Sequence, residues 1–313
     1  MIIYIISDGK KGHLSQTRGL AAALLEEARS RKPGAEHAVH EIDVSGKSFF
    51  AKFFYKGKDL TLPEPDLCLC AGHGTHWAAL SLARHKGCPC MVCMKPSLPL
   101  SWFDLCITPR HDLPEGTPVG HGIFPTNGAI NGIRPQPQVA KTETLILIGG
   151  PSKSYNWDAE TLIRQLDDIA RHSTAAMVLT TSRRTPADFA GDVNATSPSI
   201  RVIPVDETGP NWVAEHLAAA REVWVTQDSV SMVYEALSSG APVGILEMPA
   251  KEGPHKPDAS RIARGLNMLI ADGSVRRYTE WAKTRELPAN AKPLNEAGRA
   301  AAYIIEHFPS LLS

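Results

Sequence analysis

The sequence has no excess of charge of either sign, because its 313 residues include 33 Lys and Arg and 33 Asp and Glu. Without a net field to attract a polyanion, we expect no nucleic-acid partner, and contact with a membrane would have to come from a local patch. Apolar runs longer than a strand are also missing, and Met1 leads directly into the strand-like Ile2 to Ile6 rather than into a signal peptide. These features favour the cytoplasm.

Signatures of metal and ATP chemistry are missing as well. The sequence has no Asp-x-Asp signature for a metal-bound diphosphate and no Walker A loop. Its six cysteines lie within or beside apolar strand-like runs, and their Cys-x-x-Cys spacing has no second pair at zinc-ribbon distance. We therefore expect buried free thiols, no metal site and no cofactor.

What the sequence does contain is the alternation of an α/β protein, repeated twice. Strand-like runs alternate with helix-like segments from Ile2 to Met94, a stretch rich in Pro, Gly and Asn follows from Phe124 to Lys141, and the alternation restarts at Thr144. The pattern predicts two Rossmann-like domains with doubly wound parallel sheets that face a central cleft. We expect the first domain at residues 1–138 and the second at 139–313, with the last helix, 295–307, able to cross back to the first.

A polar, glycine-rich segment follows the first predicted strand. Its glycines allow an anion to approach backbone N–H groups. Asp8 and His13 are a candidate pair for taking a proton from an acceptor hydroxyl, because a carboxylate can orient an imidazole that titrates near neutrality. The alternative is that Asp8 caps the next helix and His13 is merely exposed. The other candidate residues of this segment are Gly9, Lys10, Gly12 and Gln16.

A second such segment follows the strand-like Leu67 to Cys70 and should open at the same edge of the sheet. It contains Gly72, His73, Gly74 and His76. The two histidines could be metal ligands, but no acidic residue lies close to them in the sequence. We expect them to hydrogen-bond to substrate or to support the structure.

The second half repeats this design with residues suited to phosphate. Gly149, Gly150, Ser152 and Lys153 follow its first strand as a glycine-rich, hydroxyl-bearing turn, for which an ordinary tight turn is the alternative. Residues 180–184 end another strand with two guanidinium groups, and a solvated basic loop is the alternative there. Ser182 and Arg183 are the candidate ligands from this loop.

The most informative segment runs from Val225 to Val243 and has the pattern of strand, polar turn, helix, glycine and strand. Asp228 or Ser229 at the helix start would leave N–H groups available to a diphosphate, and Glu235 two turns later could reach ribose hydroxyls. Gln227 and Ser231 complete the candidate set.

This segment resembles the donor-binding motif of glycosyltransferase-B (GT-B) enzymes and of the related non-hydrolysing UDP-N-acetylglucosamine epimerases. Together with Asp8-Gly9-x-x-Gly12-His13-x-x-Gln16 and Gly149-Gly150, it is similar to the family of predicted glycosyltransferases named after the plant mitochondrial fission ELM protein. The similarity runs through nearly the whole chain. Gly12-His13 also resembles the Gly-His of the lipid-linked transferase that makes the murein precursor, although the glycine-rich run is shorter here.

The resemblance implies a GT-B fold and metal-independent transfer of a sugar from a nucleotide-sugar donor to a saccharide or lipid-linked acceptor, for example in lipopolysaccharide or cell-envelope biosynthesis. It implies that donor phosphates bind Gly150, Ser152, Ser229 and Ser231, that the nucleoside binds Arg183 and Glu235, and that the acceptor approaches Asp8 and His13. Two alternatives stay open. An epimerase would need acidic groups on both faces of the sugar ring, with Asp8, Asp228 and Glu235 as candidates, and a non-enzymatic adaptor would keep the fold alone.

Residues 46–60, GKSFFAKFFYKGKDL, combine aromatic and basic side chains. Five of the chain's 20 aromatic residues (8 Phe, 6 Trp and 6 Tyr in all) lie here among four lysines. Such a mixture suits the interface of an anionic bilayer. The alternative is an amphipathic helix whose Phe face packs into the core. The segment predicts peripheral contact with the cytoplasmic face of the inner membrane through Phe49, Phe50, Lys52, Phe53, Phe54 and Lys56.

Overall fold

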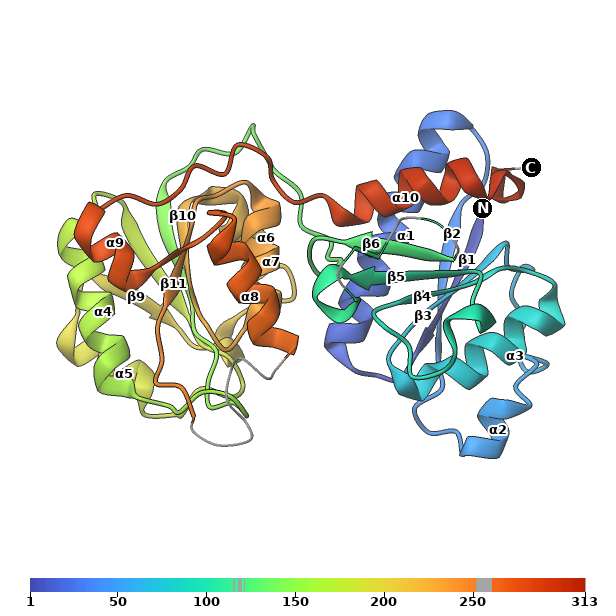
Figure 1. Cartoon of the computed structure of the whole chain (residues 1–313), viewed down its shortest axis with the longest axis horizontal. Helices are drawn as coiled ribbons and strands as arrows, with labels where there is room; N and C mark the ends of the chain where they lie inside the picture. Colours follow the sequence, from blue (N-terminus) through green and yellow to red (C-terminus); the bar gives the residue numbers. More distant parts are fainter. Residues whose placement is uncertain (115, 118–119, 121, 252–260, 313) are drawn as a thin grey trace. The chain divides into compact units, whose positions relative to one another are not determined.

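The computed structural model describes residues 1–114, 116–117, 120, 122–251 and 261–312, with the backbone alone at 261 and 262. The chain forms two compact units, an N-terminal unit of Met1–Gly132 and Asn295–Ser313 and a C-terminal unit of Ile133–Leu294 (Figure 1). The division falls after residue 132, whereas the sequence suggested 138. The last helix belongs to the N-terminal unit.

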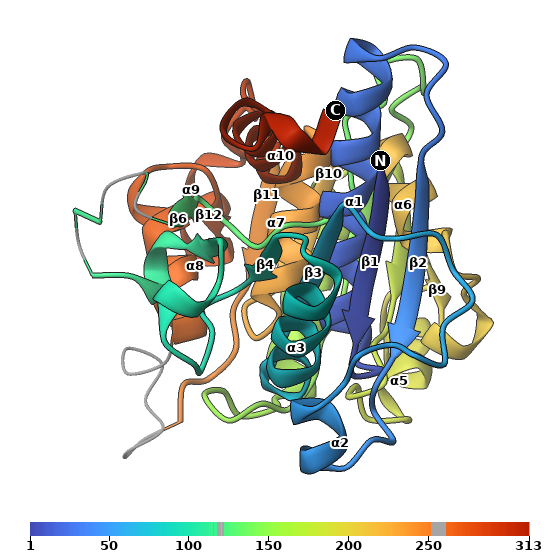
Figure 2. The ribbon, with the colours of Figure 1, turned by 90° about the vertical axis from the view of Figure 1, so that its right-hand side faces the viewer.

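The N-terminal unit is built on a six-stranded sheet in the order β2-β1-β3-β4-β5-β6, in which every neighbouring pair is parallel. The strands lie side by side in Figure 1 and, from another direction, in Figure 2. The strands are β1 (Ile2–Ser7), β2 (Ala38–Asp43), β3 (Leu67–Ala71), β4 (Cys90–Cys93), β5 (Leu105–Pro109) and β6 (Ile123–Thr126). The helices are α1 (Lys11–Arg31), α2 (Phe49–Phe53), α3 (His76–Lys86) and α10 (Glu296–His307).

The side chains of β1 alternate between the two faces of this sheet, and helices cover both faces. Ile3 and Ile5 point to one face, where they pack with α1 and α10 through residues such as Leu24 and Ile304. Tyr4 and Ile6 point to the other face and join α3 in a second cluster. Because a parallel sheet with helices on both faces is buried throughout, nearly every residue of β1 and β3 is apolar.

The C-terminal unit repeats the architecture with a second parallel sheet, in the order β12-β11-β10-β7-β8-β9. Its strands are β7 (Glu143–Leu147), β8 (Ala176–Thr180), β9 (Ile200–Ile203), β10 (Ala220–Thr226), β11 (Val243–Leu246) and β12 (Arg276–Arg277). Its helices are α4 (Ala159–His172), α5 (Phe189–Thr196), α6 (Trp212–Ala219), α7 (Val230–Ser239), α8 (Arg261–Ala271) and α9 (Tyr278–Thr284). The predicted pair of doubly wound sheets is confirmed.

The strand order determines where each unit can bind a ligand. In the N-terminal sheet β1 lies between β2 and β3, so the chain leaves β1 in one direction and returns on its other side. In the C-terminal sheet β7 lies between β8 and β10 in the same way. Ligands of doubly wound proteins bind beyond the carboxyl ends of the strands at such switch points. The segments after β1, β3, β7 and β10 therefore hold the candidate residues.

Some local predictions need correction. Helix α1 begins at Lys11, so Gly12 and His13 belong to its first turn rather than to the segment before the helix. The first residues of the Pro-, Gly- and Asn-rich stretch that begins at Phe124, where a hinge between the domains was expected, belong to the edge strand β6, and Phe124 packs into the core. All six cysteines are free, and all except Cys88 are buried. Within the residues described, no helix has the length and hydropathy needed to span a bilayer.

Candidate functional site

Asp8 and His13 form a hydrogen-bonded pair after β1. The Nδ1 atom of His13 lies 3.0 Å from Oδ1 and 3.1 Å from Oδ2 of Asp8. Burial, the largest single effect, raises the pKa of Asp8. The hydrogen bond to His13, the charge of His13 and the contacts with Lys10 together lower it by more, so the pKa of Asp8 lies below its usual value. An ionised Asp8 accepts a hydrogen bond from the Nδ1–H group of His13, which leaves Nε2 as the basic nitrogen of the ring.

The alternative, in which Asp8 caps the helix and His13 is merely exposed, differs from the structure. The N-terminal cap of α1 is Lys10, and no side chain caps the helix. The side chains of Asp8 and His13 are only 7% and 21% exposed. Asp8 also accepts a hydrogen bond from the backbone N–H of Lys10 at 3.3 Å, so the turn between β1 and α1 holds the carboxylate in place.

Two glycines after β3 make room for this pair. A Cβ atom at Gly72 would lie 2.1 Å from Cε1 of His13, and one at Gly74 would lie 3.3 Å from Cβ of Asp8. Gly72 also has a φ of +85°, a conformation that favours glycine. The turn after β3 therefore packs directly against the Asp8–His13 pair, as expected for two segments at one edge of a sheet.

Ser97 joins the two histidines of this second turn. Its hydroxyl lies 2.5 Å from Nδ1 of His73 and 3.3 Å from Nδ1 of His76. His76 is buried, and this burial, with the nearby charges of His73 and His13, lowers its pKa to about 4. His76 is therefore a neutral hydrogen-bonding group at physiological pH, whereas His73 is exposed.

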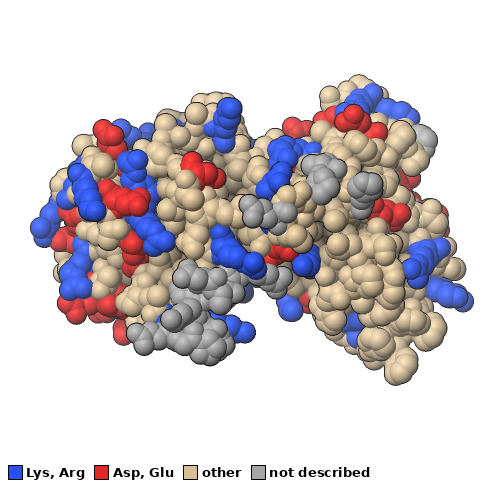
Figure 3. Space-filling model, viewed as in Figure 1, with Lys and Arg blue, Asp and Glu red and all other residues tan. Residues whose placement is uncertain are grey.

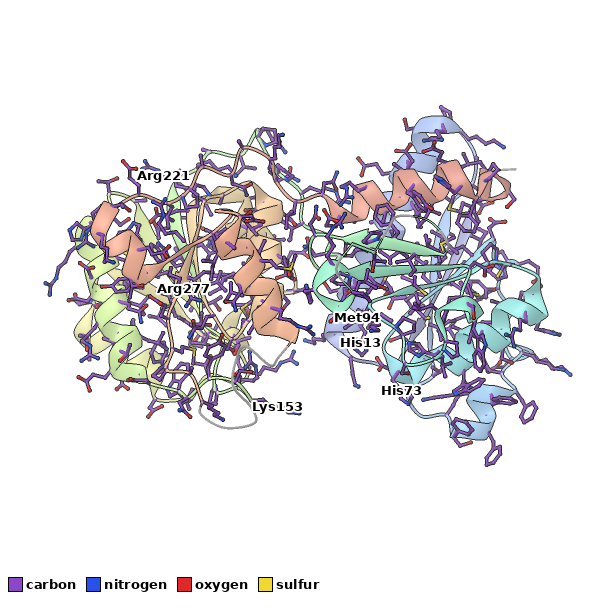
Figure 4. All side chains as sticks on the ribbon, in the orientation of Figure 1. His13, His73, Met94, Lys153, Arg221 and Arg277 are labelled. Carbon is purple, nitrogen blue, oxygen red and sulfur yellow. The ribbon has the colours of Figure 1, made fainter. Side chains whose placement is uncertain are left out.

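Ser97 and Met94 were missed in the sequence, because residues 94–97 carry no glycine-rich turn signal. Met94 directly follows β4 and has a φ of +74°, a left-handed backbone conformation that is rare for a residue with a side chain. His13, His73 and Met94 lie together at one end of the sheet (Figure 4). The other candidates of this edge are Gly9, Lys10, Gly12 and Gln16. Gly9 has a φ of +76°, and Nζ of Lys10 lies 3.7 Å from Oδ2 of Asp8. Gly12 is exposed and Gln16 is half-buried.

The edge of the C-terminal sheet carries different chemistry, beginning with two glycines after β7. A Cβ atom at Gly149 would lie 2.3 Å from Oγ of Ser229 and 2.4 Å from both carboxylate oxygens of Asp228. A Cβ atom at Gly150 would lie 2.3 Å from the carbonyl oxygen of Arg184. The N–H of Gly149 donates to Thr226 and that of Gly150 to Asp228. The loops after β7, β8 and β10 thus meet at the glycines.

Arg184 holds this junction together. Its Nη2 atom donates to Oδ2 of Asp228 at 2.7 Å and to Oγ of Ser229 at 2.9 Å, while Nη1 reaches the carbonyl of Pro151 at 3.1 Å. The Asp228 side chain is fully buried, and its Oδ1 atom has no hydrogen-bond partner among the described residues. The Arg184 side chain is 46% exposed, so its guanidinium group remains within reach of a ligand.

Arg183 is the candidate that the sequence suggests from this loop, but Arg184 is the arginine that contacts the turn after β10. Arg183 is exposed, whereas Arg184 contacts both candidate residues of the turn after β10. The hydroxyl of Ser182 donates to the carbonyl of Gly149 at 2.8 Å, so Ser182 fastens the loop after β8 to the glycine turn. With the loop anchored in this way, residue 184 rather than residue 183 bonds to Asp228.

The start of α7 is open to an anion. Its cap residue is Ser229, and no side chain bonds to the first-turn N–H groups. The Ser229 hydroxyl instead donates to Asp228 at 3.0 Å, so the side chain of this cap residue does not bond to the helix. Ser231 is exposed in the first turn. The positive end of the helix dipole adds to the attraction for negative charge.

Glu235 lies one turn further along α7. Part of the residue reaches the surface, but protein surrounds its carboxyl group, and this burial raises the pKa of Glu235 to about 7. Such a carboxyl group is poised to hydrogen-bond with hydroxyl groups of a ligand.

The remaining candidates of this unit support the loops. The buried Gln227 amide donates to the carbonyl of Met248. The Ser152 hydroxyl accepts the N–H groups of Ser154 and Tyr155 at 3.2 and 3.0 Å, which shapes the turn after β7. Lys153 is exposed on the same turn (Figure 4). In neither unit do three or more His, Cys, Asp or Glu residues of the described ranges gather as a metal site would need.

Comparisons with known proteins agree with this arrangement. A model of the family described as mitochondrial fission ELM1 matches residues 11–308. The chain belongs to this family. An uncharacterized protein of Rickettsia prowazekii is similar to it at 27% identity, over 77% of this chain and 79% of that protein.

Solved structures resemble the chain along its whole length. MnaA of S. aureus, solved with UDP, has a TM-score of 0.53 at 14% identity, covering 99% of this chain and 97% of its own. MurG of Acinetobacter baumannii has a TM-score of 0.52 at 12% identity, covering 98% and 99%. UDP-GlcNAc 2-epimerase of Neisseria meningitidis, bound to UDP-GlcNAc, has a TM-score of 0.51 at 13% identity, covering 99% and 100%. The predicted GT-B fold is confirmed.

Proposed function

We propose that this protein is a glycosyltransferase that moves a sugar from a nucleotide-sugar donor to a hydroxyl group of a saccharide or glycolipid acceptor. The observation that carries the proposal is the junction of Gly150, Arg184, Asp228 and Ser229 at the open start of α7. Membership of the ELM1 family and the GT-B fold support it. Acceptors of the bacterial envelope, such as a lipopolysaccharide core, are the class we favour.

In this proposal the C-terminal unit binds the donor. The diphosphate binds the N–H groups at the start of α7, and Arg184 turns part of its hydrogen bonding from Ser229 to a phosphate oxygen. A guanidinium group suits this exchange, because its donors lie in a fixed planar fork. Gly149 and Gly150 leave space that any side chain would fill. Glu235 binds hydroxyl groups of the ribose.

The N-terminal unit supplies the base. Nε2 of His13 takes the proton of the acceptor hydroxyl, whose oxygen forms a bond to the anomeric carbon as the bond from that carbon to the diphosphate breaks. Asp8 fixes the tautomer and stabilises the imidazolium that results. His73, Ser97 and His76 provide hydrogen-bonding groups for the acceptor.

The charge of the departing diphosphate is balanced by N–H groups and by Arg184 in this mechanism, so we propose that no divalent cation is required. Retained activity after chelation supports this point, and activity that is lost on chelation and restored by manganese contradicts it.

The test of the function is a mass-spectrometric product assay. Purified protein is incubated with a panel of nucleotide-sugars and with lipid-linked saccharides extracted from bacterial envelopes. We expect one donor to release its nucleoside diphosphate as an extracted saccharide gains the mass of one sugar. If no saccharide gains mass with any donor, the proposal fails.

The same assay, run without an acceptor, distinguishes a transferase from an epimerase. An epimerase changes the donor sugar in the absence of any saccharide, whereas a transferase leaves its stereochemistry unchanged. Two of the three acidic candidates are engaged, Asp8 by His13 and Asp228 by Arg184 and Gly150, which favours the transferase. A non-enzymatic adaptor would bind no nucleotide at all.

A further inference from the structure

Six aromatic rings form a continuous exposed cluster on the N-terminal unit. Phe49, Phe50 and Phe53 belong to α2, Phe54 follows it, Trp77 lies on α3, and Trp102 ends the short 3-10 helix Leu100–Trp102. Phe50 is 73% exposed, Phe54 65% and Trp102 41%. Helix α2 contains no buried residue. The alternative that its Phe face packs into the core is therefore wrong.

The cluster is part of the folded unit rather than a loose segment. The Ser48 hydroxyl caps α2 by accepting the N–H of Ala51. The Phe53 ring centroid lies 4.8 Å from that of Trp77, which in turn lies 5.5 Å from that of Trp102. Helix α2 thus lies beside α3, as both ribbon views show (Figures 1 and 2), and holds its rings in a fixed arrangement.

The segment that carries four of the rings is rich in lysine. Residues 46–60 contain four lysines and one acidic residue, Asp59, in a chain whose charges balance overall. Asp59 pairs with Lys47 at 3.8 Å. Lys56 and Lys58 are exposed, and the charge of Lys52 acts on Asp43 of β2. Figure 3 shows mostly uncharged surface at the lower right of the N-terminal unit, where α2 lies in Figure 1.

We propose that this aromatic cluster docks the protein on the surface of an anionic bilayer. Aromatic rings settle at the boundary between headgroups and acyl chains, and lysines beside them contact lipid phosphates. Phe50 and Phe54 enter the interface, while Lys52, Lys56 and Lys58 remain at the level of the phosphates. A membrane accounts for both features of the segment, because a purely apolar partner would leave the positive charges unbalanced.

The docking surface adjoins the acceptor-side residues. Trp77 directly follows His76 in α3, and the segment from Ser97 to Trp102 connects the hydroxyl that bonds to His73 with the cluster. A protein docked in this way holds the Asp8–His13 edge near the lipid surface and favours acceptors with a lipid anchor. This last step rests on the proposed transfer of a sugar, whereas the docking itself does not.

The test is co-sedimentation of the whole protein with vesicles. Phosphatidylcholine vesicles with and without phosphatidylglycerol are compared for the wild type, for Phe50→Ser with Phe54→Ser, and for Lys52→Glu with Lys56→Glu and Lys58→Glu. The control replaces three exposed lysines elsewhere, Lys32→Glu, Lys283→Glu and Lys292→Glu, and so changes the net charge equally. Thermal melting confirms that each variant folds, as expected for surface positions.

We expect the wild type and the control to bind the anionic vesicles at least about tenfold more strongly than the neutral ones, and both patch variants to lose at least about tenfold of that affinity. The proposal is overturned if the wild type does not sediment, or if either patch variant sediments like the control. If the protein does not bind vesicles but forms a dimer that Phe50→Ser with Phe54→Ser dissociates, the proposal is overturned, and the cluster instead contacts a second copy of the chain. Because vesicle binding is measured without donor or acceptor, its failure is distinguishable from failure of the proposed function.

Discussion

The two units have the same doubly wound topology but present different chemistry at the carboxyl ends of their strands. The N-terminal edge gathers Asp8 and three histidines, whose side chains can form hydrogen bonds with hydroxyl groups. The C-terminal edge gathers two glycines, Arg184 and an open helix start, which suit an anion. The fold therefore supplies the position of each site, and the residues after β1, β3, β7 and β10 decide what the site does.

The largest effect on activity is expected when the proposed base of the N-terminal edge is removed. For His13→Ala we expect the rate of sugar transfer to fall by about 10²–10⁴-fold, because the acceptor proton loses its base. Binding of the nucleoside diphosphate, measured by calorimetry, should stay unchanged. His85→Ala, at an exposed position of α3, is the matched control. Unchanged turnover in His13→Ala would rule out the assigned role.

The C-terminal edge is tested by its two neighbouring arginines. For Arg184→Ala we expect the affinity for the nucleoside diphosphate to fall by about 10- to 100-fold, since charge-assisted hydrogen bonds to phosphate are lost. Arg183→Ala, one residue away, should bind like the wild type. Arg184→Lys should lie between them, because an ammonium group keeps the charge but loses the planar fork. Equal affinities for Arg183→Ala and Arg184→Ala would contradict the assignment.

Glu235 contributes a pH dependence of stability to the C-terminal unit that is opposite in sign to the one His76 contributes at the N-terminal edge. Its pKa is about 7 in the folded protein, against an ordinary value of 4.5. The folded state therefore binds more protons between pH 4.5 and 7, and stability falls as the pH rises through this range, by up to about 3 kcal/mol.

Urea unfolding of the wild type and of Glu235→Gln at pH 5, 6, 7 and 8 measures this term. We expect the stability of the wild type relative to that of Glu235→Gln to fall between pH 5 and 7, because the contribution of His76 is common to both proteins. Parallel pH profiles of the two proteins would show that Glu235 titrates normally.

The smallest expected effect concerns Ser97. Its replacement in Ser97→Ala removes the hydroxyl between His73 and His76, and one hydrogen bond of this kind changes the acceptor KM by about two- to tenfold. Steady-state kinetics with varied acceptor measures this change, and donor affinity should be unaffected. A change in donor affinity instead would assign the 94–97 segment to the donor side.

The sequence predicted most of the fold, because alternating buried strands and helices leave a strong periodic signal. The helix of the segment from Val225 to Val243, for example, lies where the pattern placed it, between the polar turn and Gly240. Helices α5, α8 and α9 were missed, and the strand β6 was not recognised because Pro125 and the neighbouring glycines mask it.

The candidate site could be predicted where a turn signal marks it and not elsewhere. Gly72 and Gly149 were found because close approach requires glycine. Ser97 and Met94 were missed because their segment is brought to the edge by tertiary structure alone. The contacts of Arg184 with Asp228 and Ser229 could not be predicted, because the direction of a side chain in an irregular loop depends on tertiary contacts such as the Ser182 hydrogen bond to Gly149.

The central claim is that the C-terminal unit binds a nucleoside diphosphate. Calorimetric titration of the whole protein with UDP, GDP, ADP, CMP and TDP, first without metal and then with magnesium, tests it directly, and thermal shift provides a second readout because a ligand of the native state raises its stability. The account predicts that at least one diphosphate binds without metal and raises the melting temperature. No heat and no thermal shift with any of the five, with or without magnesium, would contradict it.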